Sequence, residues 1–282
     1  MSKVSVIGIC GMSVFMTVSH FHRPGETLTA DSLYKEAGGK GFNQAIAAAR
    51  AGARVSFLAA SGNDQYADEC EKILKNEGIN ASLIRKSGKN TALAYILTDK
   101  NGENQVTEFI NAELDKDDVT DFSSEIISSD ILLLQQEVPK KVNDEAIRIA
   151  KSHGVKIILN PAPARHIDGF TADSVYMVTP NEQEAELIDK SRFKNCVTTL
   201  GRQGCNINGN LTIPACDVKA VDTTGAGDAF NGVLAAFLSE GYDIESACRR
   251  AVYASGLSVS KKYVLNSIPF RSDLIKGGFK DE

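Results

Sequence analysis

The stretch from Asp222 to Gly232 reads Asp-Thr-Thr-Gly-Ala-Gly-Asp-Ala-Phe-Asn-Gly. It follows a strand-like end at Ala220-Val221 and leads into apolar residues that share one helix face, at Phe230, Val233, Leu234, Phe237 and Leu238. The glycines allow the backbone N–H groups of Gly225, Ala226 and Gly227 to converge at the positive end of the helix dipole. The pattern predicts a strand, an anion-binding turn and a helix.

Asp228 stands directly beside this turn. A carboxylate there repels a bound phosphate unless it serves the other reactant, an incoming hydroxyl whose proton it accepts. The arrangement is typical of a kinase with Asp228 as the catalytic base. Because Gly-Ala-Gly-Asp alone also occurs in ordinary helix-capping turns, the longer stretch is needed to favour this interpretation.

That longer stretch resembles the signature of the ribokinase-like (PfkB) carbohydrate kinases. The resemblance implies a three-layer α/β sandwich with a mostly parallel central sheet and a small β-sheet lid that closes over the sugar. It also implies an enzyme that uses ATP and Mg²⁺ to phosphorylate a primary hydroxyl of ribose or a related sugar, with Gly225, Ala226 and Gly227 as the anion hole.

Composition agrees with a small-molecule enzyme. The 282 residues, 43% hydrophobic and 24% charged, can bury one full core and carry an appendage. A net charge of −5 provides no basic field for nucleic acid or anionic lipid. The six cysteines form no Cys-x-x-Cys pair, which indicates free thiols in a reducing cytoplasm. No apolar stretch approaches the ~20 residues of a membrane span, and no secretion signal is recognised.

Short β-branched runs alternate with helical patterns along the chain, which predicts a parallel sheet with helices on both faces. The expected strands are 4–9, 55–60, 131–135, 156–160, 175–179 and 196–200, and the expected helices are 42–51, 67–77 and 143–153.

Residues 14–34 and 92–111 break this alternation and resemble strands with turns, including a tight hairpin at Asn101-Gly102. We therefore expect a β-lid of residues 13–34 and 92–111, and an α/β domain of residues 1–12, 35–91 and 112–282. Open edge strands in such a lid favour pairing with a second copy, which predicts a homodimer through the lid.

A second glycine-rich motif, Gly38-Gly39-Lys40-Gly41-Phe42-Asn43-Gln44, precedes the first expected helix. Its spacing excludes a P-loop, which needs Ser or Thr after the lysine. The Asn43 amide can donate to one hydroxyl and accept from another, as polyol recognition requires. The motif resembles the family's sugar-binding element, which implies that Gly39, Lys40 and Asn43 bind substrate. The family pattern also places Ser13 and Glu137 beside the sugar.

The nucleotide side is predicted from two further strand ends. Asn181 and Glu184 resemble the family's Asn-x-x-Glu element, which positions a nucleotide phosphate and a hydrated Mg²⁺. The alternative is structural, because a glutamate in the first turn of a helix also stabilises that helix through its dipole. The next strand ends in a loop that contains Thr199, Gly201 and Gly204, and ligands of open α/β sheets bind at such strand ends. The family resemblance places ATP beside this loop and Gly227. The resemblance implies a K⁺ site as well, at Asp222, Thr224, Ser258, Lys261, Tyr263 and Ser267.

Three departures from the ribokinase-like family pattern bear on specificity. Gly11 and Ser13 replace an Asn and an Asp that hold sugar hydroxyls. Only nine residues lie between Glu186 and Cys196, where the pattern has an additional helix, so the adenine pocket is expected to be shallower or differently capped. Tyr263 replaces a Gly in the cation loop.

These departures leave two alternatives open: a nucleoside kinase of the same fold, and a non-catalytic protein that senses a sugar or nucleotide. The segment Asn160-Pro161-Ala162-Pro163 also resembles the family, and we assign it no chemistry.

Overall fold

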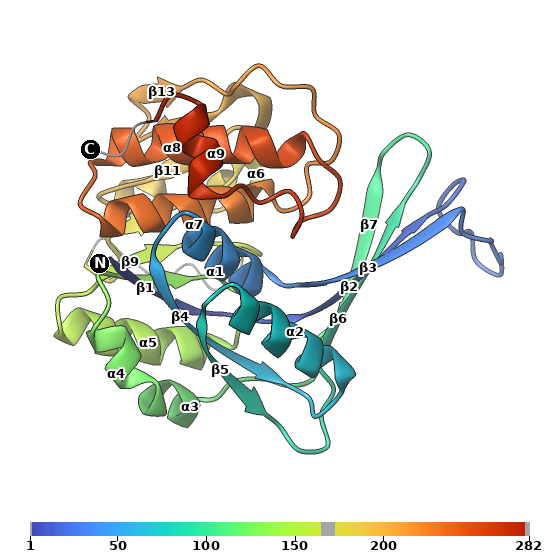
Figure 1. The fold of residues 1–282 in the computed structure, drawn as a ribbon, viewed down its shortest axis with the longest axis horizontal. Coiled ribbons are helices and arrows are strands. Elements are labelled where there is room, and N and C mark those ends of the chain that lie inside the picture. The colour runs from blue at the N-terminus through green and yellow to red at the C-terminus, as the bar shows by residue number, and fades with distance from the viewer. Residues whose placement is uncertain (1, 165–172, 280–282) are drawn as a thin grey trace.

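Alternating strands and helices build a layered body in the computed structural model, which describes residues 2–164 and 173–279 (Figure 1). The strands are β1 (Lys3–Ile7), β2 (Gly11–Thr17), β3 (Ser32–Gly38), β4 (Arg54–Ser61), β5 (Asn80–Arg85), β6 (Ala92–Thr98), β7 (Asn104–Phe109), β8 (Ile131–Leu134), β9 (Lys156–Leu159), β10 (Met177–Val178), β11 (Val197–Thr199), β12 (Cys205–Ile207) and β13 (Leu211–Ile213). The helices are α1 (Lys40–Arg50), α2 (Gln65–Asn76), α3 (Lys116–Asp121), α4 (Ser123–Ile127), α5 (Lys140–Ser152), α6 (Glu182–Glu186), α7 (Ala226–Ser239), α8 (Ile244–Val259) and α9 (Arg271–Lys276).

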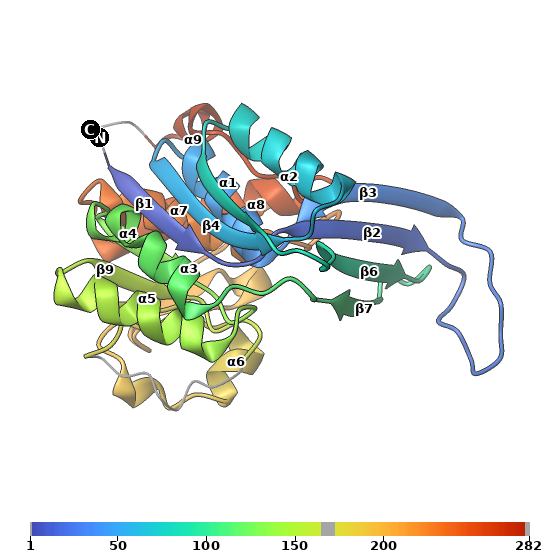
Figure 2. The same ribbon diagram turned by 90° about the horizontal axis from the view of Figure 1, so that it is seen from below.

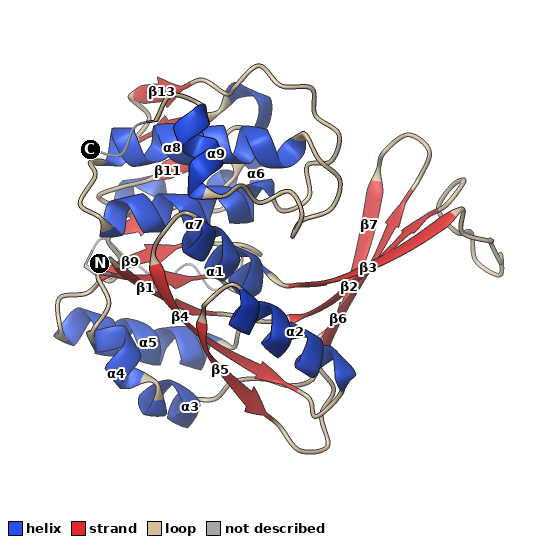
Figure 3. Ribbon diagram, in the orientation of Figure 1, coloured by secondary structure: helices blue, strands red, loops and turns tan. Residues whose placement is uncertain are grey.

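The main sheet has the strand order β10-β9-β8-β1-β4-β5, and its neighbouring strands pair in parallel. Successive residues of a strand face opposite sides of the sheet. Val4 and Val6 therefore pack in one core with α1, α7 and α8, whereas Ile7 packs in the other with α3, α4 and α5. Figure 3 shows the sheet between the two helical layers. The predicted fold class is confirmed.

The expected strand at 196–200 differs from its prediction. β11 belongs to a small antiparallel sheet with β12 and β13, and only isolated parallel bridges, Val178 to Cys196 and Asn181 to Thr199, connect it to β10. β12 occupies one edge of β11 and β13 pairs with β12, and no pattern in the sequence predicts these two short strands. The short link before β11 contains only a 3₁₀ turn, Lys190–Arg192, as the nine-residue spacing predicts.

The second sheet projects from the body and has the order β3-β2-β6-β7, as seen from below in Figure 2. β2 pairs with β6 in parallel, and the other two pairs are antiparallel. The predicted hairpin joins β6 to β7, and Gly102 in its turn has φ 84°. The domain boundaries of this lid remain a prediction, and the predicted α/β domain includes 165–172 and 280–282, which lie outside the described residues.

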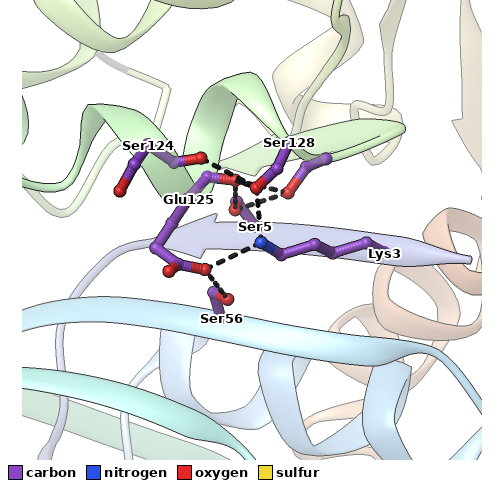
Figure 4. A network of polar contacts seen from close by, with 7 residues as sticks. Lys3, Ser5, Ser56, Ser124, Glu125 and Ser128 are labelled. Atoms are coloured by element: carbon purple, nitrogen blue, oxygen red, sulfur yellow. Dashed lines mark hydrogen bonds and ion pairs between the residues drawn. The ribbon is translucent and has the colours of Figure 1, made fainter.

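A polar cluster ties helix α4 to the amino-terminal ends of β1 and β4 (Figure 4). The Lys3 ammonium donates to Glu125 Oε2 at 2.8 Å, and the Ser56 hydroxyl donates to the same oxygen at 2.6 Å. The hydrogen bond from Lys3, followed by that from Ser56, holds the pKa of the Glu125 carboxyl below its ordinary value. This end of the sheet is therefore braced by side chains, while the carboxyl ends of the strands remain available for a ligand.

Helices α1 and α7 cross at very close range. A Cβ added to Gly232 of α7 would lie 2.4 Å from the Gln44 carbonyl oxygen and 2.5 Å from the Ala47 Cβ of α1. Only a glycine permits this approach, because real Cβ atoms do not come so near a neighbouring backbone. The crossing sets the first turns of the two glycine-rich motifs side by side. No helix in residues 2–164 and 173–279 is long and apolar enough to cross a membrane.

Candidate active site

The turn before α7 presents unpaired backbone donors. Gly225 precedes the helix with φ 75°, a left-handed conformation that glycine adopts without strain. In the described part of the chain, the N–H groups of Gly225, Gly227 and Asp228 have no hydrogen-bond partner, whereas that of Ala226 reaches the Thr223 carbonyl at 3.3 Å. Free N–H groups at a helix start form an anion-binding site. Gly225 and Gly227 of the predicted anion hole therefore have free donors, and Ala226 has a weakly engaged one.

Asp228 is held by two amide side chains from α1. Asn43 Nδ2 donates to Asp228 Oδ2 at 2.9 Å, and Gln44 Nε2 donates to Asp228 Oδ1 at 3.0 Å. Burial raises the pKa of the Asp228 carboxyl, while the Lys40 charge and these two donors oppose that rise. The donors fix the carboxylate and stabilise its ionised form, which is the form that accepts a proton.

A chain of buried amides supports these donors. Gln44 Nε2 also donates to Asn160 Oδ1 at 3.0 Å, and Gln44 Oε1 accepts from Gln135 Nε2 at 2.7 Å. Asn160 Nδ2 donates to the Thr179 carbonyl, and Thr179 Oγ1 donates to Asn231 Oδ1 at 2.6 Å. The network closes at α7, where Asn231 Nδ2 donates to the Gly227 carbonyl at 2.8 Å. Both helix starts are thus fixed to the ends of the central strands.

Lys40 and Glu137 form a second pair beside Asp228. The Lys40 backbone N–H donates to Glu137 Oε2 at 2.9 Å, and its ammonium lies 3.4 Å from Glu137 Oε1. Burial, partly offset by the Lys40 charge, raises the pKa of Glu137 to about 7. Burial tends to lower the pKa of Lys40, but the charges of Glu137, Asp228 and Glu108 outweigh it and leave that pKa raised.

These groups line a cavity of about 180 Å³ between the body and the lid. The predicted residues that line it are Ser13, Gly39, Lys40, Asn43, Glu137, Thr224, Gly225 and Asp228. Its lid wall is formed by Phe15, Ala94, Ile96, Asn104, Val106 and Glu108. In the described structure Asn43 Oδ1 is buried without a hydrogen-bond partner, so it can accept from a ligand hydroxyl.

The predicted nucleotide residues lie at the neighbouring strand ends. Asn181 and Glu184 form a reciprocal capping box at the start of α6, with hydrogen bonds of 2.8 and 2.9 Å. Both residues therefore stabilise the start of this helix. The bridge between Asn181 and Thr199 sets α6 beside the turn that contains Gly201 and Gly204. Burial raises the pKa of Glu184, and the Asn181 N–H and the Lys40 charge oppose that rise.

Five of the six residues predicted to hold K⁺ lie in two loops that Asp222 joins, and the sixth, Ser258, lies in the last turn of α8. Asp222 Oδ1 accepts from the Thr224 N–H and Oδ2 from the Tyr263 N–H, each at 2.9 Å. Tyr263 has φ 66°, which is unusual for a residue other than glycine. Its ring stacks on Tyr34 of the lid at 3.6 Å between centroids. Packing thus offsets the cost of placing a bulky residue where the family pattern has glycine.

The remaining residues of this set are tied to local carbonyl groups. The Ser258 hydroxyl donates to Ser255, the Lys261 N–H to Ser258, and the Ser267 hydroxyl to Val264. Each hydroxyl oxygen keeps lone pairs that a cation can use. The loops are therefore rich in oxygen, with Asp222 as the acid between them.

Sequence reasoning did not identify three contributors to this site. Gln44 stands within the quoted sugar motif but was given no role, and Asn160 was assigned no chemistry although it supports Gln44. Glu108 lies in the predicted lid, and only the pairing register of β7 shows that it faces the cavity. The family resemblance of the motifs around Gln44 and Asn160 was the one available signal.

The chain resembles known kinases over nearly its whole length. Residues 1–271 match the pfkB family of carbohydrate kinases, and the chain belongs to that family. It is 34% identical to a ribokinase of Haemophilus influenzae, over 97% of both chains. It is 31% identical to a deoxyribokinase of Salmonella typhi, over 94% of this chain and 95% of the other. The crystal structure of a ribokinase from Thermotoga maritima superposes with a TM-score of 0.86 at 32% identity, covering 98% of this chain and 99% of the other.

Proposed function

We propose that this protein is an ATP-dependent kinase that transfers the γ-phosphoryl group to a primary hydroxyl of ribose or a related sugar. The observation that carries the proposal is the position of Asp228, held by Asn43 and Gln44 beside free N–H donors and facing the cavity of the sugar motif. Family membership and the ribokinase relatives support the same activity.

Asp228 accepts the proton of the acceptor hydroxyl and orients its oxygen toward the phosphorus. Phosphoryl transfer passes through a loose transition state, so positioning and charge stabilisation contribute most of the catalysis. The N–H groups of Gly225 and Gly227 stabilise charge on the transferred group, and that of Ala226 joins them if it leaves the Thr223 carbonyl. Closure of the lid excludes water and limits hydrolysis of ATP.

Asn181, Thr199, Gly201, Gly204 and Gly227 form the nucleotide side of this proposal. Mg²⁺ neutralises phosphate charge when bound, and it favours oxygen ligands while keeping several waters. The Glu184 carboxylate fits this role through water, because one of its oxygens is left unbonded by the capping box. Within the described residues no group of three or more His, Cys, Asp or Glu side chains could hold a metal alone, so a phosphate-bound, hydrated ion suits the site.

K⁺ at Asp222 and its neighbouring loops would fix the carbonyl groups behind the anion hole. The donors fit such an ion, since carboxylate, carbonyl and hydroxyl oxygens are the ligands of hard cations. Replacing K⁺ by tetramethylammonium should lower turnover if this site operates, and unchanged turnover would remove K⁺ from the proposal.

The cavity favours a neutral monosaccharide. Glu108, Glu137 and Asp228 face a single cation, Lys40, so a sugar that already bears a phosphate would be repelled. Its volume of about 180 Å³ lies below the roughly 300–1,000 Å³ of sites for drug-sized ligands, which favours one sugar ring over a nucleoside. The braced Asp228 also argues for catalysis rather than sensing alone.

A coupled assay of ADP formation tests the proposal. Purified protein with Mg²⁺ and K⁺ would be given ribose, deoxyribose, fructose, other sugars and nucleosides in turn. Turnover of a sugar supports the proposal, and turnover of a nucleoside alone would correct the acceptor. ATP binding without turnover of any compound would favour the sensing alternative.

A further inference from the structure

A row of four side chains crosses the face of the second sheet, β3-β2-β6-β7, that lines the cavity. The strand registers pair Glu36 of β3 with Ser13 of β2, Ser13 with Ala94 of β6, and Ala94 with Glu108 of β7. Paired residues on adjacent strands point to the same face of a sheet. Two small residues therefore lie in the middle of the row, with one carboxylate at each end.

The two carboxylates have different surroundings. Glu36 is 4% exposed, and its oxygens accept the N–H groups of Val264 and Leu265 at 2.8 and 3.1 Å. Both oxygens of Glu36 therefore bind the backbone of the loop that follows α8. Glu108 is exposed, lines the cavity, and makes no hydrogen bond or ion pair with the described part of the chain.

Glu108 also acts on the residues of the sugar motif. Its charge contributes to the raised pKa of Lys40 and to that of Glu137, on the opposite wall of the cavity. Neighbouring strands lie about 4.8 Å apart, so its backbone is roughly 10 Å from that of Ser13, with only the Ala94 methyl between them. A long side chain at Glu108 can thus extend over the space that Ser13 and Ala94 leave open.

We propose that Glu108 determines specificity by accepting hydrogen bonds from hydroxyl groups of the sugar at the end remote from Asp228. The proposal deepens the proposed kinase function and rests on it. β2 offers only Gly11 and the Ser13 hydroxyl at this end, so β7 supplies the acceptor carboxylate instead. The ligand class is a neutral sugar with free hydroxyls facing the lid. Because β7 is an edge strand of the lid, this contact depends on the position of the lid.

Calorimetric binding to D-ribose, 2-deoxy-D-ribose and a panel of other pentoses and hexoses tests this assignment. Glu108→Ala should raise the sugar Kd roughly 10- to 100-fold, the effect of losing a hydrogen bond to a charged group. Glu108→Gln keeps an acceptor and should lose less. The control is Glu103→Gln, a carboxylate in the same hairpin that does not line the cavity, and it should bind sugar like the wild type. ATP affinity and thermal stability should be unchanged in all three variants.

The binding and turnover results separate this inference from the kinase proposal. Sugar binding that weakens in Glu108→Ala, in a protein that forms no sugar phosphate, would support the role of Glu108 and reject the kinase. Turnover of a sugar with equal Kd in wild type and Glu108→Ala would keep the kinase and overturn the role of Glu108. Wild-type protein that binds no sugar in the panel would overturn it as well.

Discussion

Asp228 is the residue on which the proposed chemistry depends most directly. We expect Asp228→Asn to lower kcat by roughly 10²- to 10⁴-fold, the usual contribution of a positioned general base. ATP affinity should change little, since the free N–H groups of Gly225 and Gly227 are backbone groups that remain in place. A coupled assay measures kcat and calorimetry measures ATP binding. Turnover within a few fold of the wild type would exclude Asp228 as the base.

Glu137 should make stability depend on pH. Its pKa rises from an ordinary 4.5 to about 7 in the fold, so the folded protein binds this proton more tightly than the unfolded chain. The resulting stabilisation is complete below about pH 4.5 and is lost as pH rises through 7.

Comparison with Glu137→Gln isolates this effect, since the other titrating groups are shared. From pH 5 to pH 8, the free energy of unfolding of the wild type should fall relative to that of the variant, by up to roughly 3 kcal/mol. Denaturant unfolding at several pH values measures the difference. A difference that stays constant with pH would show that Glu137 has an ordinary pKa in the fold.

At the scale of elements, the crossing of α1 and α7 connects packing to catalysis. Gly232→Ala places a methyl group 2.4 Å from the Gln44 carbonyl and must push the helices apart. Such overpacking costs about 1–3 kcal/mol, and it should also lower kcat because Asn43 and Gln44 would no longer reach Asp228.

Ala235→Gly in the same helix is the matched control for this prediction. Ala235 is fully buried, and its replacement weakens α7 without forcing the helices apart. Unfolding curves and kcat, measured well below both melting temperatures, separate the two effects. Equal loss of stability with equal kcat in both variants would show that the crossing does not position the base.

Local signals explain what could be predicted from the sequence. The turn at Gly225, the hairpin at Gly102 and the central strands depend on neighbouring residues, and they appear in the structure. Gln44 and Asn160 meet across 116 positions, so their hydrogen bond has no local signal. The face of β7 that bears Glu108 depends on register, and the antiparallel pairing of β11 with β12 joins strands that no local pattern identifies. Tertiary pairing decided each of these cases.

At the scale of the whole molecule, the two ends of the main sheet have separate tasks. The cluster of Lys3, Ser56 and Glu125 braces the amino-terminal strand ends, while the cavity lies at the carboxyl ends beneath the lid. The second sheet joins the body through Glu36 of β3 and through the stack of Tyr34 on Tyr263, both near the loops that Asp222 holds. We therefore expect movement of the lid to change the position of the turn before α7.

The outer face of the lid carries exposed apolar side chains, and we expect it to form the interface of a homodimer. Leu33, Tyr95 and Phe109 are 60%, 46% and 50% exposed, and the strand registers place them on the face away from the cavity. β3 and β7 also leave open edges, which favour pairing with another copy. We expect light scattering to give twice the mass of one chain, and Tyr95→Glu to shift the protein to monomer because it buries a charge in the interface. Leu187→Glu, at an exposed apolar residue of the body, should leave the dimer intact. A wild-type monomer, or equal dissociation in both variants, would exclude pairing through the lid.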